Sequence, residues 1–228
     1  MELKKLPELL APAGSLDALY AAIDAGADAV YLGAKGFNAR MNAANFSDEE
    51  LAAGIARAHR FGVKVYATLN TLVHDRELGD FLETARTLRD AGVDAVIVAD
   101  LGAMALLSRE LPDLPVHAST QASVHSLDGA RAMAALGCTR VVPARELSLE
   151  NIRTLTTHAP LEIEVFVHGA HCMSASGMCY MSSFFGARSG NRGLCAQPCR
   201  LNFRSGKREY ALSLKDMCLA DETERLIE

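Results

Sequence analysis

The sequence predicts an α/β protein of the (β/α)8 TIM-barrel type, with seven β-then-α units visible and the last unit missing. Strand-like apolar stretches alternate with helical stretches as far as residue 168 of the 228-residue chain. A junction motif also repeats: DAGADAV at 24–30 returns as DAGVDAV at 90–96 and, more loosely, as ALGCTRV at 135–141. Each copy is a helix end, a glycine and a strand start. Short connections between such units imply parallel strands with right-handed crossovers.

An open, doubly wound sheet is the alternative fold for the same order of elements. Its dinucleotide-binding version carries a G-x-G-x-x-G motif after the first strand. No such motif follows the first predicted strand here. The barrel is therefore the favoured prediction.

The predicted strands are short apolar runs bounded by glycine, proline or polar residues. They cover residues 8–14, 28–33, 63–70, 94–100, 116–119, 140–144 and 162–168. The predicted helices lie between them, and most begin at a capping serine or end before a glycine. They cover residues 15–25, 47–61, 77–91, 103–111, 127–136 and 148–158. Ser47 and Glu50 form the pattern of a capping box.

Composition and charge narrow the function classes. Half of the residues are hydrophobic, which suits a substantial buried core. The formal net charge of −5 argues against a strongly basic nucleic-acid platform over the whole chain, but a basic patch could be local. No apolar run reaches the ~18 residues of a membrane span, and no signal peptide is expected. We therefore expect a cytoplasmic protein, in which six cysteines favour metal binding or catalysis over disulfides.

Polar residues follow several predicted strands, at the end that forms the active face of a barrel. They are Arg40, Asn70, Asp100, Ser119, Gln121, Arg145 and His168. Arg40 and Arg145 could hold a small anion, with Asn70, Gln121 and His168 as polar lining. The alternative is that these residues are ordinary loop surface.

Glu8 and Glu164 stand within otherwise apolar predicted strands, where an unpaired carboxylate would be costly. Either residue could point to the helix-facing side near a strand end and be satisfied there. A buried pairing with an arginine is the other possibility. Both are minor site candidates.

Four cysteines lie in a glycine-rich stretch after the seventh predicted strand. They are Cys172, Cys179, Cys195 and Cys199, in the spacing C-x6-C-x15-C-x3-C. Four thiolates can hold a 4Fe–4S cluster or a tetrahedral zinc ion, but zinc usually shows two tight cysteine pairs. Only Cys195 and Cys199 come near that spacing, so a cluster is favoured and zinc is the alternative. Neighbouring apolar residues, among them Met178, Phe184 and Phe185, are expected to shield it from solvent.

Three further interpretations of the cysteines remain open. Cys218 could replace Cys199 as the fourth ligand. Cys138 stands at a helix-to-strand junction and is expected to be a buried structural thiol. The third is that the four clustered cysteines bind nothing, although free cysteines seldom cluster in this way.

The stretch around the first two of these cysteines resembles the signature of peptidase family U32. It reads E-x-F-x-x-G-A-H-C-x4-G-x-C-x-M-S from Glu164 to Ser182. Only His171 departs from the family pattern, which prefers an aliphatic residue there. The similarity extends over the whole chain through ELLAPAGS, GADAVYLG, NFSDEEL and GNRGLCAQPCR.

This resemblance implies a function in RNA hydroxylation. Some family members install a 5-hydroxy group on the tRNA wobble uridine using prephenate, one hydroxylates a cytidine of 23S rRNA, and a pair acts in oxygen-independent ubiquinone synthesis. Several carry a 4Fe–4S cluster on four cysteines, which match Cys172, Cys179, Cys195 and Cys199. The resemblance thus implies RNA as substrate and a small anionic co-substrate such as prephenate, and it is compatible with a partner subunit.

Two other functions are compatible with the resemblance. The family name records a protease activity reported for some members, so a collagenase-like peptidase is one alternative. The sequence gives the peptidase alternative little support, because it contains no His-Glu-x-x-His helix and no Gly-x-Ser-x-Gly elbow. His171 adjoins Cys172, but sequence adjacency does not supply the geometry of a catalytic pair. A non-catalytic cluster-bearing subunit is the second alternative.

The chain divides into barrel units at 1–168 and a cluster-binding Cys-rich segment at 169–228. In the second part we expect two short strands within 201–212 and a helix that begins at 221–224. No eighth unit follows, and family chains continue past this point. We therefore expect a truncated chain whose last barrel unit would lie beyond residue 228.

Overall fold

Seven parallel strands form one curved sheet in the computed structural model, which describes residues 6–39 and 46–227. They are β1 (Leu10–Pro12), β2 (Ala29–Gly33), β3 (Lys64–Leu69), β4 (Ala95–Val98), β5 (Val116–Ala118), β6 (Arg140–Val141) and β7 (Glu162–Ile163). The strands are hydrogen-bonded in chain order from β1 to β7. A doubly wound sheet would instead reverse its strand order in the middle. The barrel prediction is confirmed as a curled half-barrel, and the open-sheet alternative is wrong.

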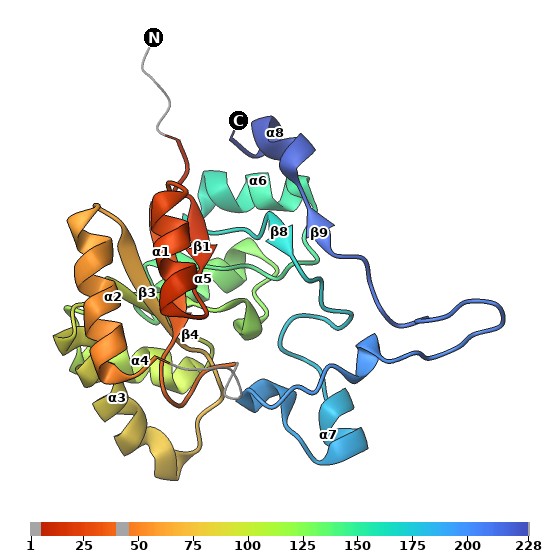
Figure 1. The fold of residues 1–228 in the computed structure, drawn as a ribbon, viewed down its shortest axis with the longest axis horizontal. Helices are drawn as coiled ribbons and strands as arrows, with labels where there is room; N and C mark the ends of the chain where they lie inside the picture. Colours follow the sequence, from red (N-terminus) through yellow and green to blue (C-terminus); the bar gives the residue numbers. More distant parts are fainter. Residues whose placement is uncertain (1–5, 40–45, 228) are drawn as a thin grey trace.

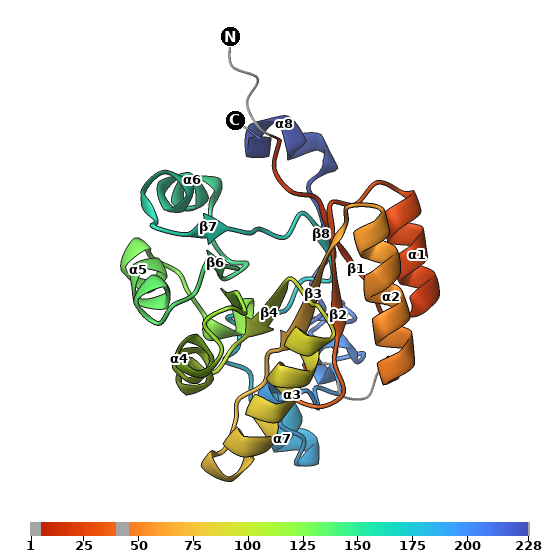
Figure 2. The same ribbon diagram turned by 90° about the vertical axis from the view of Figure 1, so that its left-hand side faces the viewer.

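Six helices cover the outer face of the sheet, each between two successive strands (Figure 1). They are α1 (Leu16–Asp24), α2 (Asp48–Arg60), α3 (Leu78–Asp90), α4 (Leu101–Glu110), α5 (Leu127–Ala135) and α6 (Leu149–His158). Figure 2 shows the strands as an arc inside these helices, with β1 and β7 towards its two ends. None of the helices in residues 6–39 and 46–227 is long and apolar enough to span a membrane.

The helices begin where the sequence predicts because local side chains cap them. The Ser47 hydroxyl accepts a bond from the Glu50 amide at 3.1 Å, and the Glu50 carboxylate accepts one from the Ser47 amide at 2.8 Å. This is the expected capping box, which satisfies amides that have no partner within the helix. At the helix ends, Gly26 and Gly92 adopt φ values of 87° and 92°, a region that glycine enters without steric cost.

Alternate residues of each strand face the helices and the barrel interior. In β3, Val65, Ala67 and Leu69 belong to the main core between strands and helices. Tyr66, between them in sequence, packs inside the barrel with small or β-branched residues, including Ala95. The interior is therefore filled by side chains, as in other small barrels.

A charged network occupies the barrel interior at the start of the strands. The Arg140 guanidinium donates to Glu8 at 2.8 Å, to Glu162 at 2.7 Å and to Glu164 at 3.2 Å. Burial acts to raise the pKa of Glu8, but hydrogen bonds from Arg140, Tyr66 and Lys64 outweigh it and lower the pKa to about 2. Burial raises the pKa of Glu164. Of the two possibilities for Glu8 and Glu164, the buried pairing with an arginine is confirmed.

The seventh strand is shorter than predicted. Its last sheet hydrogen bond runs from the Glu164 amide to the Val141 carbonyl at 2.9 Å. The next donor in the register would be Pro143, which has no N–H, so the ladder stops there. His168 consequently lies outside this sheet, in β8 (His168–Gly169), which pairs antiparallel with β9 (Met217–Cys218).

The C-terminal part agrees with the sequence only in its last helix. The two strands expected within 201–212 are wrong, since the described chain there forms only an isolated bridge between Ser205 and Arg208. The remaining helices are α7 (Met181–Gly186) and α8 (Thr223–Ile227), and α8 begins within the expected range. Short 3-10 turns supply most of the other regular structure, among them η1 (Asp75–Glu77), η2 (Thr120–Ala122) and η3 (Gly190–Arg192).

Candidate functional site

The Cys-rich segment is fixed to the barrel at the end where the strands finish. At one point, Arg192 of η3 makes two hydrogen bonds to the Glu77 carboxylate, at 2.7 and 2.9 Å. The same guanidinium donates to the Leu72 carbonyl at 2.9 Å, in the connection that follows β3. The hydrogen bond from Arg192 lowers the pKa of Glu77 to about 2. This bidentate pair sets both the position and the orientation of η3.

A second attachment lies beyond β5 and β6. The Glu146 carboxylate accepts hydrogen bonds from the Ser176 amide at 2.7 Å and from the Ser176 hydroxyl at 2.9 Å. Next to it, Gly177 lies against the backbone of Gln121 in η2. A Cβ added at Gly177 would stand 2.3 Å from the Gln121 carbonyl oxygen, and its φ of +76° also disfavours a side chain. Glycine is thus required for this close approach.

The two attachments place the Cys-rich segment over this end of the barrel. Burial raises the pKa of Cys199, and the neighbouring Cys172 and Cys195 thiols add to the effect. Cys179 joins the same region through Gly190. A Cβ added there would lie 3.5 Å from the Cys179 carbonyl oxygen and 3.8 Å from the Cβ of Cys195.

The described residues do not form a site for a single metal ion. Zinc binds sulfur at about 2.3 Å, so its four thiolates would crowd within about 4 Å of one another. No group of three or more His, Cys, Asp or Glu residues within the described ranges is packed closely enough to hold one ion.

The expected apolar shielding of the cysteines is wrong. Phe184 and Phe185 of α7 are 85% and 62% exposed, and Met178 is also exposed. Cys195 is itself exposed, whereas Cys172, Cys179 and Cys199 are partly buried. The apolar side chains of this segment face solvent because α7 projects from the barrel (Figure 1).

Three of the predicted polar residues have structural partners. Asn70 accepts a hydrogen bond from the Ala39 amide at 2.9 Å, which ties the connection after β2 to the end of β3. Asp100 caps α4 through the Ala103 amide at 2.9 Å. Ser119 is buried and caps η2. Arg40 lies outside the described residues.

Arg145 is the predicted residue with the clearest place at the site. Its guanidinium donates to the Ala170 carbonyl at 3.3 Å and lies 5.5 Å from the centre of the Phe166 ring. The Nε atom is buried without a hydrogen-bond partner in the described chain. Arg145 also lines a cavity of about 210 Å³, whose other walls come from residues 143–152, 165–166 and 217–222. These walls are apolar apart from Glu222, and no cysteine lines the cavity.

Gln121 and His168 lie in different parts of the structure. Gln121 is half-buried in η2 under Gly177. His168 is exposed in β8, where its register partner is Cys218 of β9. His168 therefore follows β7 at a distance, in a separate two-stranded sheet, instead of ending the seventh strand.

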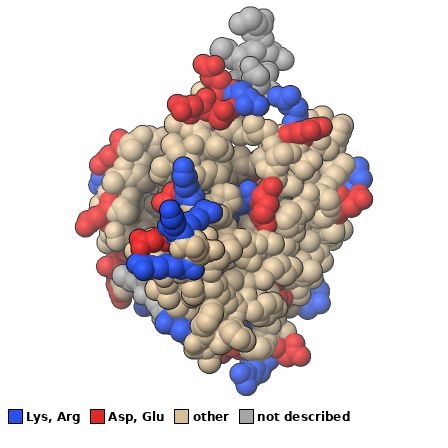
Figure 3. All heavy atoms as spheres, turned by 90° about the vertical axis from the view of Figure 1, so that its right-hand side faces the viewer, with Lys and Arg blue, Asp and Glu red and all other residues tan. Residues whose placement is uncertain are grey.

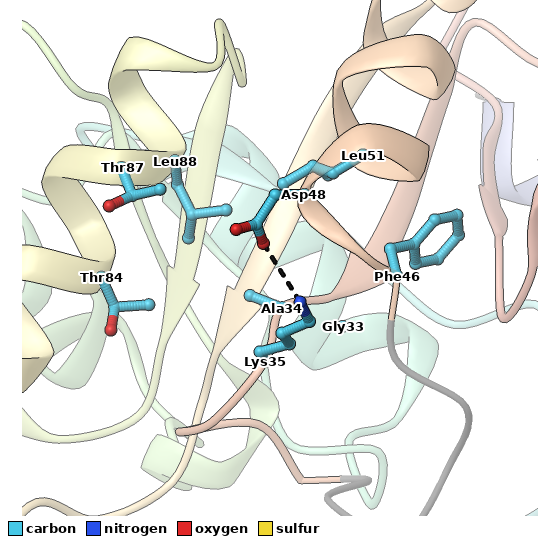
Figure 4. Close-up of a pocket in the computed structure, with 9 residues that line it drawn as sticks. All are labelled: Gly33, Ala34, Lys35, Phe46, Asp48, Leu51, Thr84, Thr87 and Leu88. Atoms are coloured by element: carbon cyan, nitrogen blue, oxygen red, sulfur yellow. Dashed lines mark hydrogen bonds and ion pairs between the residues drawn. The ribbon is translucent and has the colours of Figure 1, made fainter.

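A cavity between α2 and α3 does not belong to this site. It has a volume of about 170 Å³ and lies outside the barrel, beside the end of β2 (Figure 4). Its lysine, Lys35, pairs with Asp48 at 3.3 Å across the opening. Leu51, Leu88 and Phe46 supply much of the remaining wall.

Sequence reasoning missed the residues that dock the Cys-rich segment. Glu77, Glu146 and Ser176 stand in polar connections, where no periodicity marks them. Arg192 lies within the GNRGLCAQPCR motif, which was the one available signal. Cys138 is buried as expected, and burial raises the pKa of its thiol to about 11.

The chain matches the family model described as peptidase family U32 over residues 14–228. It is 43% identical over 86% of its length to the 23S rRNA 5-hydroxycytidine C2501 synthase of Escherichia coli, and 37% identical over 98% to tRNA hydroxylation protein P1 of Bacillus subtilis. A collagenase of Porphyromonas gingivalis is 36% identical over 91% of the chain.

These alignments cover only part of each relative: 29% of the synthase, 56% of the tRNA hydroxylation protein and 52% of the collagenase. Among solved structures, the U32 peptidase Mk0906 superposes with a TM-score of 0.64 at 18% identity. That superposition covers 85% of this chain and 78% of the other. It agrees with the fold described above.

Proposed function

The chain belongs to peptidase family U32, and on this basis we propose that it takes part in RNA hydroxylation in the cytoplasm, at a tRNA wobble uridine or an rRNA cytidine. The names of its rRNA- and tRNA-modifying relatives support this class of substrate. The structural observation that carries the proposal is the Cys-rich segment, held across the end of the barrel by Arg192 and Gly177. Barrel enzymes have their active sites at this end.

Cys172, Cys179, Cys195 and Cys199 would hold a 4Fe–4S cluster in this proposal. Such a cluster supplies one-electron chemistry when it is bound. Cys199 is preferred to Cys218 as the fourth ligand because Cys172 and Cys195 influence its pKa, whereas Cys218 lies in β9 opposite His168. Zinc is the alternative, but the spacing of the described donors does not favour one ion.

Arg145 would bind the anionic co-substrate. Replacing a pyrimidine C5–H by C5–OH removes two electrons from the base, so the co-substrate must give up an oxygen atom, take up those two electrons and leave as its deoxygenated product. A small organic anion that carries a hydroxyl group, such as prephenate, would fill this role. The cavity of about 210 Å³ beside Arg145 is below the usual ~300 Å³ of ligand pockets, so it suits a small molecule. Arg40, Asn70, Gln121 and His168 remain candidates for the surrounding polar groups.

The peptidase alternative receives little support from the side chains. Ser176, Glu146 and His125 form a cluster, with His125 3.4 Å from Glu146. The carboxylate, however, stands between the hydroxyl and the imidazole. A serine protease needs the imidazole next to the hydroxyl, where it can take the proton. Robust gelatin cleavage by metal-free protein would nevertheless favour the peptidase over the hydroxylase.

Mass spectrometry of tRNA and rRNA nucleosides from a deletion strain tests the proposal. We expect one hydroxylated pyrimidine to disappear and to return with the wild-type gene. Arg145→Ala should fail to restore it at equal protein level, because a lost charge-assisted contact costs about 1.5–3 kcal/mol. Arg153→Ala, at an exposed position of α6, is the control. A deletion strain with unchanged nucleosides would reject the function, and full rescue by Arg145→Ala would reject the role of Arg145.

A further inference from the structure

Residues 180–215, which we call the basic arm, have a charge opposite to that of the rest of the molecule. The arm contains seven of the 23 Lys and Arg residues but only one of the 28 Asp and Glu residues. It therefore carries a formal charge of +6, while the remaining residues carry −11. The chain as a whole is acidic, yet this local segment has the electrostatic character of a surface for polyanions.

Several of the cations in the arm have no acidic partner. Arg192 and Arg200 hold the segment together, and Arg204 pairs with Glu209. The other four form no salt bridge within residues 6–39 and 46–227, and all four are exposed. They are Arg188, Lys207, Arg208 and Lys215. Figure 3 faces the arm and shows Lys and Arg side chains gathered on it.

Aromatic rings stand exposed among these cations. Phe184 is 85% exposed, and its ring centre lies 5.4 Å from that of Phe185 in an edge-to-face arrangement. Phe185 in turn lies 6.4 Å from Phe203. Tyr180 and Tyr210 are also more than half exposed. Large apolar side chains left in water at one place mark a surface for a ligand or a partner.

We propose that the basic arm binds single-stranded RNA, with Phe184 and Phe185 stacking on unpaired bases and the free cations contacting phosphates. Exposed rings beside cations are the usual means of holding single-stranded nucleic acid, because every base has a face that can stack. Duplex RNA hides those faces and would meet only the charges. A protein partner would need an acidic surface to match the charge of the arm, whereas every RNA carries that charge on its backbone.

The site deepens the proposed function, on which it rests. The arm contains Cys195 and Cys199 and is docked through Arg192 at the end of the barrel. Because α7 lies between Cys179 and Cys195 in the chain, an unpaired base held on α7 would lie within the Cys-rich segment. RNA loops, in which bases are already unstacked, fit this requirement better than helical regions.

Fluorescence anisotropy with an oligouridylate of about 12 nucleotides and an RNA duplex of similar length tests the surface. The full chain, as isolated, is titrated against each probe from about 50 to about 200 mM salt. Wild-type protein should bind the single strand more tightly than the duplex. Phe184→Ala with Phe185→Ala should weaken single-strand binding by about fivefold or more and leave duplex binding nearly unchanged. Phe61→Ala, at an exposed phenylalanine in the turn that ends α2, is the aromatic control.

The charge contribution is tested by Lys207→Ala with Arg208→Ala. For single strands, each lost phosphate contact should reduce the slope of log affinity against log salt by about 0.7. Arg60→Ala with Arg109→Ala removes the same charge from α2 and α4 and should leave the slope unchanged. Melting curves check that each variant is folded.

The possible outcomes distinguish a failure of the proposed RNA-binding surface from a failure of the proposed RNA-hydroxylation function. If wild-type protein binds RNA and none of the arm variants changes that binding, the proposed binding surface is rejected. This holds even if the deletion strain lacks its hydroxylated nucleoside. Unchanged nucleosides in that strain would reject the function, whatever the arm binds. Equal affinity for both probes, insensitive to the phenylalanines, would rule out base stacking. No binding to either probe at low salt would also overturn the proposal and point to a protein partner for the rings.

Discussion

At the scale of single residues, Cys179 and Cys138 form a matched pair for testing the cofactor. Cys179 stands beside Gly190 in the docked segment, whereas Cys138 is buried at the end of α5, away from the other thiols. Cys179→Ser should lose most of the iron and the visible absorbance of purified protein, because serine replaces a thiolate ligand. Cys138→Ser should keep both. Full iron content in Cys179→Ser would sink the assignment of this ligand.

A second pair of substitutions decides the fourth ligand. Cys199→Ser should lose iron and Cys218→Ser should retain it, because Cys199 lies near Cys172 and Cys195 while Cys218 is exposed in β9. Iron analysis of both variants, purified in parallel without oxygen, is the measurement. The opposite result would move the fourth ligand to Cys218.

At the scale of elements, docking of the Cys-rich segment depends on the close contact between Gly177 and η2. Gly177→Ala should weaken the docking of this segment on the barrel, because the new Cβ would stand 2.3 Å from the Gln121 carbonyl oxygen. Faster amide hydrogen exchange across residues 172–180 would measure the detachment.

Gly206→Ala is the control for backbone strain at Gly177. Its φ of +61° carries a similar penalty, but nothing lies within 4 Å of the added atom. We expect a loss of about 1 kcal/mol of local stability at Gly206, without a change in exchange near the cysteines. Identical exchange patterns in the two variants would show that the contact with η2 does not matter.

Local and long-range chemistry explain which elements the sequence could predict. The start of α2 follows from Ser47 and Glu50, three residues apart, so the sequence contains all that is needed. The end of β7 depends on Pro143 in a neighbouring connection, and the run of apolar residues after Ile163 gives no sign of it. The docking contacts of Arg192 and Ser176 join distant positions, so they could not be read from spacing.

At the scale of the whole molecule, Arg140 joins the two ends of the half-barrel, since Glu8 precedes β1 and Glu164 follows β7. Arg140→Leu should lower the free energy of unfolding by about 1–3 kcal/mol, because it leaves the partly buried Glu164 without its hydrogen-bond donor and leaves Glu8 with only Tyr66 and Lys64. Chemical denaturation monitored by circular dichroism measures this. Glu164→Gln added to that variant should restore part of the loss.

Arg131→Leu supplies the comparison for Arg140. Its partner Asp128 lies on the exposed surface of α5, and such pairs contribute about 0–1 kcal/mol. A loss in Arg140→Leu no larger than that in Arg131→Leu would mean that the network does not hold the barrel ends together.

The same interior makes the stability of the fold depend on pH in a definite direction. His117 is 4% exposed and lies edge-on to Tyr66 at 4.8 Å. Burial and the Arg140 charge lower the pKa of His117 from 6.5 to about 3, so the folded chain keeps this imidazole neutral while the unfolded chain protonates it. Its contribution is complete above pH 6.5 and is lost as the pH falls towards 3. The Glu8 contribution is complete above pH 4.5 and is lost towards pH 2.

Acidification should therefore destabilise the protein in two steps, of which the first belongs to His117. Between pH 6.5 and 4.5, this histidine can contribute a slope of up to about 1.4 kcal/mol per pH unit, which the raised pKa of Glu164 opposes. His117→Phe keeps a ring beside Tyr66 but cannot take a proton, so the free energy of unfolding should vary less steeply over that interval. His158→Phe, at an exposed position of α6, should keep the wild-type slope. Denaturation at several pH values gives the slopes. Equal slopes in His117→Phe and wild type would show that His117 is not held neutral in the barrel.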